Sequence, residues 1–204
     1  MLPEEVMMKE AYVIIQAAKC LSDKLDGVID LVIGSAQSNK HLIVCGLGKN
    51  RMICEKAAAT FASMGIPAIY LDPCEALHGS LGMIVADQLI IGISKSGNTP
   101  EVIATFDAAG KIGVKLVSIT CSESSLLGNI CKQYGGSNIY IPCELEADYN
   151  NIVPTCSSAV LTAVIDAIGC VASQKLGFTK QQFLDRHPGG TLGNNLKSEL
   201  NNRT

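Results

Sequence analysis

The sequence predicts an α/β protein: a three-layer αβα sandwich around a five-stranded parallel sheet with the strand order 2-1-3-4-5. Short aliphatic runs of five or six residues alternate with segments of helical spacing, and this alternation is typical of crossover connections between parallel strands. Hydrophobic residues make up 48% of the chain and aromatic residues only 4%, which suits aliphatic strands that are buried on both faces. The length of 204 residues suits one compact domain.

The expected elements follow one another along the chain. The aliphatic runs lie at residues 41–45, 67–71, 88–93, 115–120 and 138–142. Helical spacing marks residues 51–64, 99–109, 125–133, 155–176 and 179–186. Residues 4–36 show the same spacing, and we expect one long or broken helix there. The chain is therefore divided into an N-terminal helical segment, residues 1–38, packed on a domain of residues 39–204, whose sheet has the flavodoxin-like order.

Composition excludes several classes of partner. The net charge is −3 and no basic run occurs, which argues against nucleic-acid and anionic-membrane partners. No stretch approaches the ~20 uninterrupted apolar residues of a membrane span, and the acidic start MLPEEVMMKE is unlike a signal peptide. The nine cysteines form no C-x-x-C pair, so we interpret them as buried apolar residues in a reducing compartment. We expect a cytoplasmic protein without a functional metal.

The loop after the third expected strand predicts a phosphate site. It reads Ser94-Lys95-Ser96-Gly97-Asn98-Thr99, and Pro100 suits the first helical position. Ligands of a parallel sheet bind beyond the carboxyl ends of its strands, and hydroxyl donors at a helix N-terminus suit an anion. A plain N-cap turn is the alternative, but it needs only one hydroxyl. We assign the phosphate to Ser94, Ser96, Gly97 and Thr99.

Candidate catalytic groups follow the first two strands. After the first strand come Gly46, Gly48 and Lys49. The glycines allow the backbone to approach a ligand closely, and the ammonium could neutralise an oxyanion; otherwise Lys49 is a solvated helix-start lysine. The spacing fits neither G-x-G-x-x-G nor a Walker A loop. After the second strand comes His78, which can titrate near neutral pH.

Further candidates lie on the later helices and after the fifth strand. Glu101 is either a helix-dipole carboxylate or a catalytic acid or base. Glu144 follows the fifth strand, and the long helix beyond it opens with Ser157 and Ser158, which join Gly48 as expected phosphate ligands. His187 ends the last expected helix, where the alternative is a benign C-terminal cation.

Together these motifs resemble the sugar isomerase (SIS) domain family and, within it, the D-arabinose-5-phosphate isomerases. The loop at 94–99 is similar to the family's phosphate loop, S-x-S-G-x-T/S. The narrower resemblance rests on GLGKN (46–50), AATFASMGIPA (58–68), EALHGSLGMI (75–84), PTCSS (154–158) and RHPGGTLG (186–193), and covers about residues 40–195. Lys95 and Asn98 depart from the family's common Ser-Asn-Ser-Gly-Glu, and Ser80 from its Gly-Asp. We expect Lys95 to add positive charge near the phosphate.

This resemblance implies the SIS fold and an aldose–ketose isomerase that interconverts D-ribulose 5-phosphate and D-arabinose 5-phosphate through an enediolate, without a cofactor. It implies a homotetramer with shared active sites and a product that feeds synthesis of the eight-carbon sugar Kdo for lipopolysaccharide or capsule. From end-product logic we add the hypothesis that CMP-Kdo binds and inhibits. The chain resembles the single-domain form, without cystathionine-β-synthase (CBS) domains. The family's lysine, acidic residues and histidines fall on Lys49, Glu101, Glu144, His78 and His187.

Two alternatives remain open. The substrate could be another ketose phosphate, a hexulose or heptulose phosphate. The chain could also be a non-catalytic module that senses a sugar phosphate, although its N-terminal segment is too short and acidic for a helix-turn-helix domain. Which carboxylate or histidine is the general base also stays open at this point.

Overall fold

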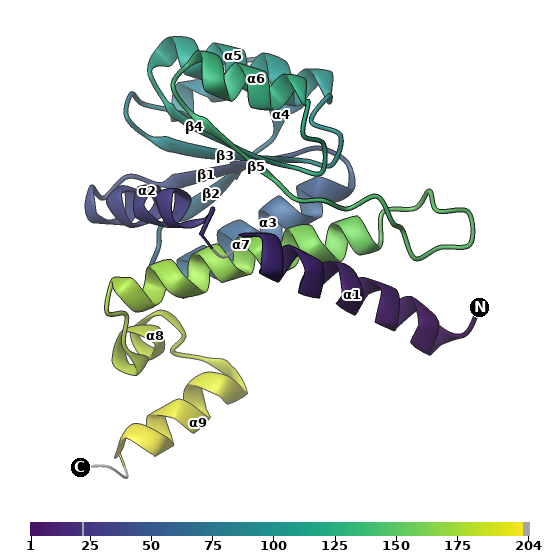
Figure 1. Cartoon of the computed structure of the whole chain (residues 1–204). Helices are drawn as coiled ribbons and strands as arrows, with labels where there is room; N and C mark the ends of the chain where they lie inside the picture. Colours follow the sequence, from purple (N-terminus) through teal and green to yellow (C-terminus); the bar gives the residue numbers. More distant parts are fainter. Residues whose placement is uncertain (22, 202–204) are drawn as a thin grey trace.

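A computed structural model describes residues 1–21 and 23–201 of the chain. Five parallel strands form one sheet in the order β2-β1-β3-β4-β5, which confirms the predicted topology (Figure 1). The strands are β1 (Leu42–Cys45), β2 (Ala68–Leu71), β3 (Leu89–Ser94), β4 (Lys115–Thr120) and β5 (Ser137–Tyr140). Both neighbours of β1 pair with it in parallel register, with Cys45 opposite Leu71 on β2 and Gly92 on β3.

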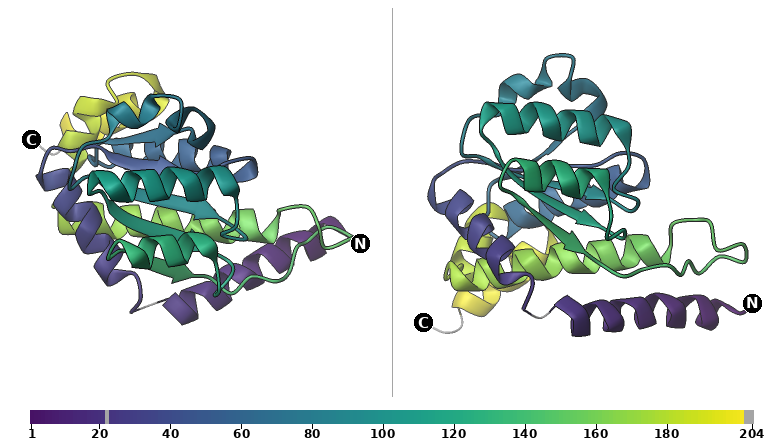
Figure 2. Two further views of the ribbon diagram at one scale, coloured as in Figure 1. Left: turned by 90° about the horizontal axis from the view of Figure 1, so that it is seen from above. Right: turned by 45° about the horizontal axis from the view of Figure 1, so that its top comes forward.

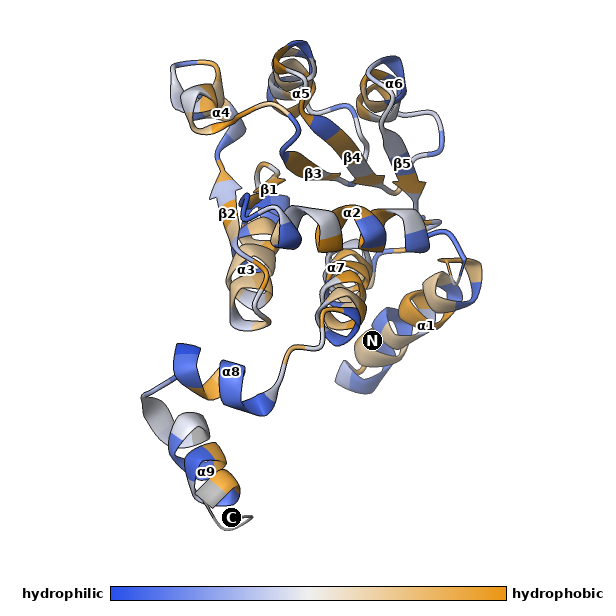
Figure 3. Ribbon diagram, turned by 90° about the vertical axis from the view of Figure 1, so that its left-hand side faces the viewer, coloured by the Kyte–Doolittle hydropathy of each residue, from blue (hydrophilic) through white to orange (hydrophobic). Residues whose placement is uncertain are grey.

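Helices cover both faces of this sheet (Figure 3). One face carries α5 (Pro100–Ile112), α6 (Leu126–Gln133) and the short α4 (Pro73–Ala76). The other carries α1 (Pro3–Leu21), α2 (Asp26–Gln37), α3 (Lys49–Ser63) and α7 (Cys156–Lys175). A one-turn helix of 3-10 type, η1 (Ser80–Met83), follows α4, and α8 (Lys180–Arg186) and α9 (Gly190–Asn201) end the described chain. The arrangement is the expected three-layer sandwich.

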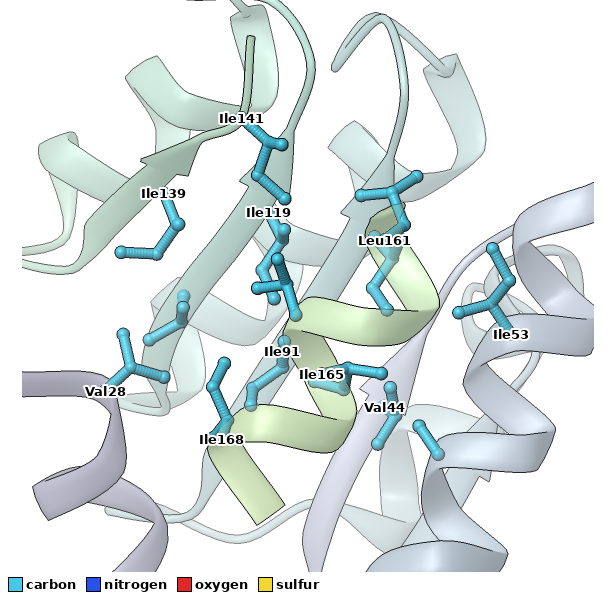
Figure 4. Packing of buried hydrophobic residues seen from close by; sticks show 14 of the residues in the cluster. Val28, Val44, Ile53, Ile91, Ile119, Ile139, Ile141, Leu161, Ile165 and Ile168 are labelled. Carbon is cyan, nitrogen blue, oxygen red and sulfur yellow. The ribbon is translucent and has the colours of Figure 1, made fainter. Parts of the chain in front are cut away.

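The central strands separate two hydrophobic cores. Every residue of β1 and of β3 is buried, and because successive side chains of a strand point to opposite faces, alternate residues supply each core. Ile90 packs with Phe106 and the α5–α6 layer. Ile91 packs on the opposite face, where α7 contributes Leu161, Ile165 and Ile168 (Figure 4). Burial of each such side chain stabilises the fold by about 1.5–3 kcal/mol.

Helix α7 is the central helix of its layer. It is long and apolar enough, by length and composition, to cross a membrane, but 56% of its most apolar window is buried inside the protein. It packs against α1, α2 and α3 as well as the sheet. We therefore interpret its hydrophobicity as that of a core helix.

The N-terminal segment is a broken helix. Its two parts, α1 and α2, are joined by residues 22–25, of which Ser22 lies outside the described residues. Val13 and Leu21 of α1 and Val28 of α2 belong to the same core as the sheet. The N-terminal half of α1 extends beyond the sheet beside the connection between β5 and α7, as Figure 2 shows.

Three helices lie where the sequence analysis predicted none. Asp72 caps α4 by accepting a hydrogen bond from the Cys74 amide at 2.9 Å, and one turn is too short to show a hydrophobic period. The 3-10 helix η1 is equally short. Helix α9 begins at Gly190 and includes Gly193, and glycine inside a helix lowers its propensity by about 1 kcal/mol relative to alanine.

Candidate functional site

The first two motifs meet at the carboxyl edge of the sheet. Because β1 and β3 are neighbours, the turn that begins at Gly46 passes directly against the end of β3: a Cβ at Gly46 would lie 2.9 Å from the Ile93 carbonyl oxygen. Gly48 has φ 64° and caps α3, whose first residue is Lys49. The exposed Lys49 side chain therefore starts beside the loop that follows β3.

Side chains from β2 fix this turn. The Tyr70 hydroxyl donates a hydrogen bond to the Gly46 carbonyl at 3.0 Å. The Arg51 guanidinium lies 5.6 Å from the Tyr70 ring centre and 3.4 Å from the Asp72 carboxylate. The start of α3, and with it Lys49, is thus held by the neighbouring strand.

The loop at 94–99 is a closed turn at the start of α5. Ser94 Oγ lies 3.0 Å from Thr99 Oγ1 and accepts a hydrogen bond from the Gly97 amide at 3.1 Å. Gly97 has φ 64°, and a Cβ there would lie 2.2 Å from the Ser125 Cβ, so the turn requires glycine. The first bond within α5 runs from the Ile103 amide to the Thr99 carbonyl, and the preceding amides of the helix have no intrahelical acceptor.

Accessibility divides the four expected loop ligands into two groups. Ser94 and Gly97 are buried, and their polar groups shape the turn. Ser96 is exposed and Thr99 is partly exposed. Reachable hydroxyl groups and the open N-terminus of α5 thus lie at the same carboxyl edge of the sheet as Lys49, an arrangement that suits an anion.

The unusual Asn98 has a local structural partner. Its side-chain oxygen accepts a hydrogen bond from the Leu126 amide at 3.1 Å, at the first residue of α6. The Gly97 carbonyl accepts from the Leu127 amide at 2.9 Å and the Lys95 carbonyl from the Cys121 amide at 2.8 Å. The loop is therefore anchored to α6 and to the end of β4.

His78 and Glu101 lie near this edge as well. Thr105 of α5 donates a hydrogen bond to the Pro73 carbonyl at 3.1 Å, which ties α5 to α4. Glu101 is the second residue of α5, and partial desolvation of the thiol together with the carboxylates of Asp72 and Glu101 raises the pKa of Cys74. His78 is exposed in the turn after α4.

Glu146 is a site residue that the sequence analysis missed. Its carboxylate has no exposed surface, and Oε1 accepts a hydrogen bond from Lys95 Nζ at 2.6 Å. Oε2 accepts from the amides of Thr155 and Ser157 at 2.8 and 3.1 Å, at the start of α7. Although burial raises the pKa of Glu146, the hydrogen bonds from Lys95, Ser157 and these amides lower it to about 2. A lysine within a hydroxyl-rich loop was the one available signal that an internal carboxylate partner exists.

This carboxylate changes the interpretation of the α7 N-terminus. Ser157 is buried, and both its amide and its hydroxyl donate to Glu146. The Ser158 hydroxyl donates to the Pro154 carbonyl at 3.3 Å. Because the helix N-terminus already holds an internal anion, we leave Ser157 and Ser158 out of the phosphate site. The expected extra positive charge of Lys95 is likewise compensated by Glu146.

The two remaining predicted residues lie in different places. Glu144 is exposed in the segment after β5, two residues before Glu146, whose carboxylate contacts Lys95 of the loop. His187 Nε2 lies 3.2 Å from the Ser63 hydroxyl, and its ring stacks on Phe183 at 3.9 Å. Ser63 is the last and Lys49 the first residue of the 15-residue α3, so they lie about 20 Å apart.

The described residues contain no group of three or more His, Cys, Asp or Glu side chains that could hold a metal ion. All nine cysteines are free thiols in the structure as described. The residues named above can bind an anion at the loop, neutralise negative charge through Lys49 and transfer protons through carboxylates or imidazoles.

Comparison with known proteins identifies the family and supports the fold. The sequence pattern that defines the SIS domain family matches residues 36–165. The chain belongs to the SIS domain family. It is 32% identical to the "Probable arabinose 5-phosphate isomerase" of Haemophilus influenzae over 95% of this chain and 55% of that protein. It is 34% identical to the arabinose 5-phosphate isomerase KdsD of Pseudomonas aeruginosa over 76% of this chain and 47% of the relative. The chain thus spans about half the length of these curated relatives.

A solved structure matches almost its full length. The E. coli CFT073 protein c3406, in complex with arabinose 5-phosphate, superimposes with a TM-score of 0.83 at 34% identity, and the match covers 91% of this chain and 95% of that one. The loop at 94–99 lies within the matched SIS domain, and the two curated relatives described above are named as arabinose 5-phosphate isomerases.

Proposed function

We propose that the chain is an aldose–ketose isomerase that interconverts D-ribulose 5-phosphate and D-arabinose 5-phosphate. The observation that carries the proposal is the joint placement of Lys49 and the loop at 94–99 at the carboxyl ends of adjacent strands. The relatives named as arabinose 5-phosphate isomerases and the arabinose 5-phosphate complex of the similar structure support the choice of substrate.

In this proposal the phosphate lies against Ser96, Thr99 and the N-terminus of α5. A base removes a proton from C1 of the ketose, which gives a 1,2-enediolate; a proton passes from O1 to O2, and a proton returned to C2 gives the aldose. The Lys49 ammonium neutralises the charge that develops on the enediolate oxygens. Glu101 and His78, which lie at the same edge, and Glu144 and His187 are the candidate proton carriers.

The position of His187 favours shared active sites. In one chain it lies at the far end of α3 from Lys49, so we infer that it serves the site of a neighbouring subunit in a homotetramer. Met7, Met8, Tyr12 and Ile15 of α1 expose 52–69% of their surfaces, and such apolar surface is typical of a protein interface.

Three finer statements belong to the same proposal. The enzyme works in the cytoplasm, its product feeds synthesis of Kdo for lipopolysaccharide or capsule, and CMP-Kdo binds as an end-product inhibitor. Isothermal titration with CMP-Kdo tests the last statement, and the absence of binding would exclude it.

A panel of ketose phosphates tests the choice of substrate. We expect turnover of ribulose 5-phosphate and at least about tenfold lower kcat/KM for hexulose and heptulose phosphates, because each extra carbon must fit a site anchored at the phosphate. Equal or faster turnover of a longer ketose would replace the proposed substrate, and binding of all of them without turnover would indicate a sensing module.

A further inference from the structure

Lys95 connects the phosphate loop to the segment between β5 and α7. Its backbone lies between Ser94 and Ser96, yet its side chain does not extend freely into solvent. Lys95 Nζ donates to Glu146 Oε1 at 2.6 Å, and the two side chains are 37% and 0% exposed. An ammonium from the loop after β3 is therefore paired with a carboxylate of the segment between β5 and α7.

Glu146 is held in place independently of Lys95. Thr155 and Ser157 of the α7 start donate to its carboxylate through backbone and side-chain groups, and the Glu146 amide donates to Asn151 Oδ1. The carboxylate is thus a fixed negative charge, and Lys95 is the contact that reaches it from the loop.

The opposite charges of Lys95 and Glu146 determine how this contact affects phosphate binding. A buried carboxylate that loses its partner is strongly unfavourable, and a negative charge close to a phosphate dianion repels it in a medium of low dielectric constant. With Lys95 present, the pair is neutral overall, and the hydroxyl and amide donors of the loop can act on a dianion without that opposition.

We propose that Lys95 is a positioning residue that acts through Glu146: it neutralises this carboxylate at the start of α7, so that a phosphate dianion can bind beside it. This inference rests on the proposed function, in which the loop binds the phosphate of the sugar. It goes further because it gives a role to Lys95, which departs from the family's common loop sequence, and predicts different effects for the two members of the pair.

Phosphate binding in a double-mutant cycle tests the inference. The variants are Lys95→Met, Glu146→Gln and the combination of both, and the probe is inorganic phosphate, titrated by calorimetry against the full chain. We expect Lys95→Met to weaken binding about tenfold, which corresponds to about 1.4 kcal/mol. We expect Glu146→Gln to weaken it by no more than about twofold and the double variant to lie within about threefold of wild type, because neither leaves an unpaired buried carboxylate.

Two further variants separate positioning from general stability. Lys95→Arg retains the charge and restores binding to within about threefold of wild type. Lys56→Met is the matched control, because Lys56 also forms an ion pair with a carboxylate, Asp166, but between α3 and α7 and away from the loop; it leaves phosphate binding unchanged. With ribulose 5-phosphate, Lys95→Met raises KM and changes kcat less than about threefold.

Several outcomes would overturn the inference: unchanged phosphate binding in Lys95→Met, equal weakening by both single variants, or an equal loss in Lys56→Met. If Lys95→Met fails to fold, the double variant is compared with Glu146→Gln instead. Phosphate binding that is more than about tenfold weaker in the double variant than in Glu146→Gln would contradict charge neutralisation. Wild type that binds no phosphate would overturn the inference and the loop assignment together. Wild type that binds phosphate but isomerises no sugar would refute only the proposed reaction.

Discussion

Lys95 Nζ lies 2.6 Å from Glu146 Oε1, and this bond joins a partly exposed loop lysine to a carboxylate without exposed surface. The hydrogen bonds at Glu146 outweigh the burial that raises its pKa and lower it to about 2, below the ordinary value of about 4.3. Ionised Glu146 therefore stabilises the fold above pH ~4.3, and this contribution is lost as the pH falls toward 2.

Glu146→Gln should remove that pH dependence. Between pH 6 and pH 3 we expect the free energy of unfolding of wild type to fall by on the order of 2 kcal/mol more than that of the variant. Urea denaturation at a series of pH values measures the difference. Parallel pH profiles for the two proteins would show that Glu146 is not held in its ionised form by the fold.

Lys49→Met tests the group that faces the reacting end of the sugar. We expect kcat to fall by about 10²–10³-fold, because one oxyanion-stabilising group is lost, while the dissociation constant of inorganic phosphate stays within about twofold. Steady-state kinetics and calorimetry measure the two effects. A large loss of phosphate affinity with unchanged kcat would place Lys49 at the phosphate instead.

Gly97→Ala tests the geometry of the phosphate loop. Gly97 has φ 64°, and the added Cβ would lie 2.2 Å from the Ser125 Cβ, so we expect a loss of more than about 1 kcal/mol in stability together with weaker phosphate binding. Gly34→Ala is the control: it lies inside α2 with nothing within 4 Å of the added Cβ, and should gain about 0.5–1 kcal/mol. Equal stability of the two variants would contradict the described loop.

Complementation tests whether sites are shared. We expect Lys49→Met and His187→Ala to be separately inactive. Co-expressed in equal amounts, they should form mixed oligomers in which about one quarter of the sites have both residues, one from each chain. Activity of the purified mixed oligomer at about that fraction supports the inference from the His187–Ser63 contact. Mixed oligomers that remain inactive would place both residues in the same subunit's site.

Much of the architecture could be predicted because its physical signals are local. The aliphatic runs of β1 and β3 reflect burial on both faces, and Pro100 with the preceding hydroxyls marks the start of α5. The capping box of Thr179 and Gln182 likewise marks the start of α8. These signals lie within a few residues of one another in the sequence.

What could not be predicted depends on contacts between distant segments. Lys95 and Glu146 are 51 residues apart, and only the path of the β5–α7 connection brings the carboxylate back to the loop. Ser157 likewise donates its amide and hydroxyl to Glu146, 11 residues before it, although its place at a hydroxyl-rich helix start looked suitable for a phosphate. His187 is a similar case, because its contact with Ser63 depends on how α8 packs.

The most direct test of the proposed reaction is proton NMR of ribulose 5-phosphate incubated with the wild-type chain in D2O. The proposal predicts the appearance of arabinose 5-phosphate, with deuterium at C2 where the transferred proton has exchanged with solvent, and conversion about 10²–10³-fold slower with Lys49→Met. Unchanged ribulose 5-phosphate in the presence of phosphate-binding wild-type protein, or ribose 5-phosphate as the product, would contradict it.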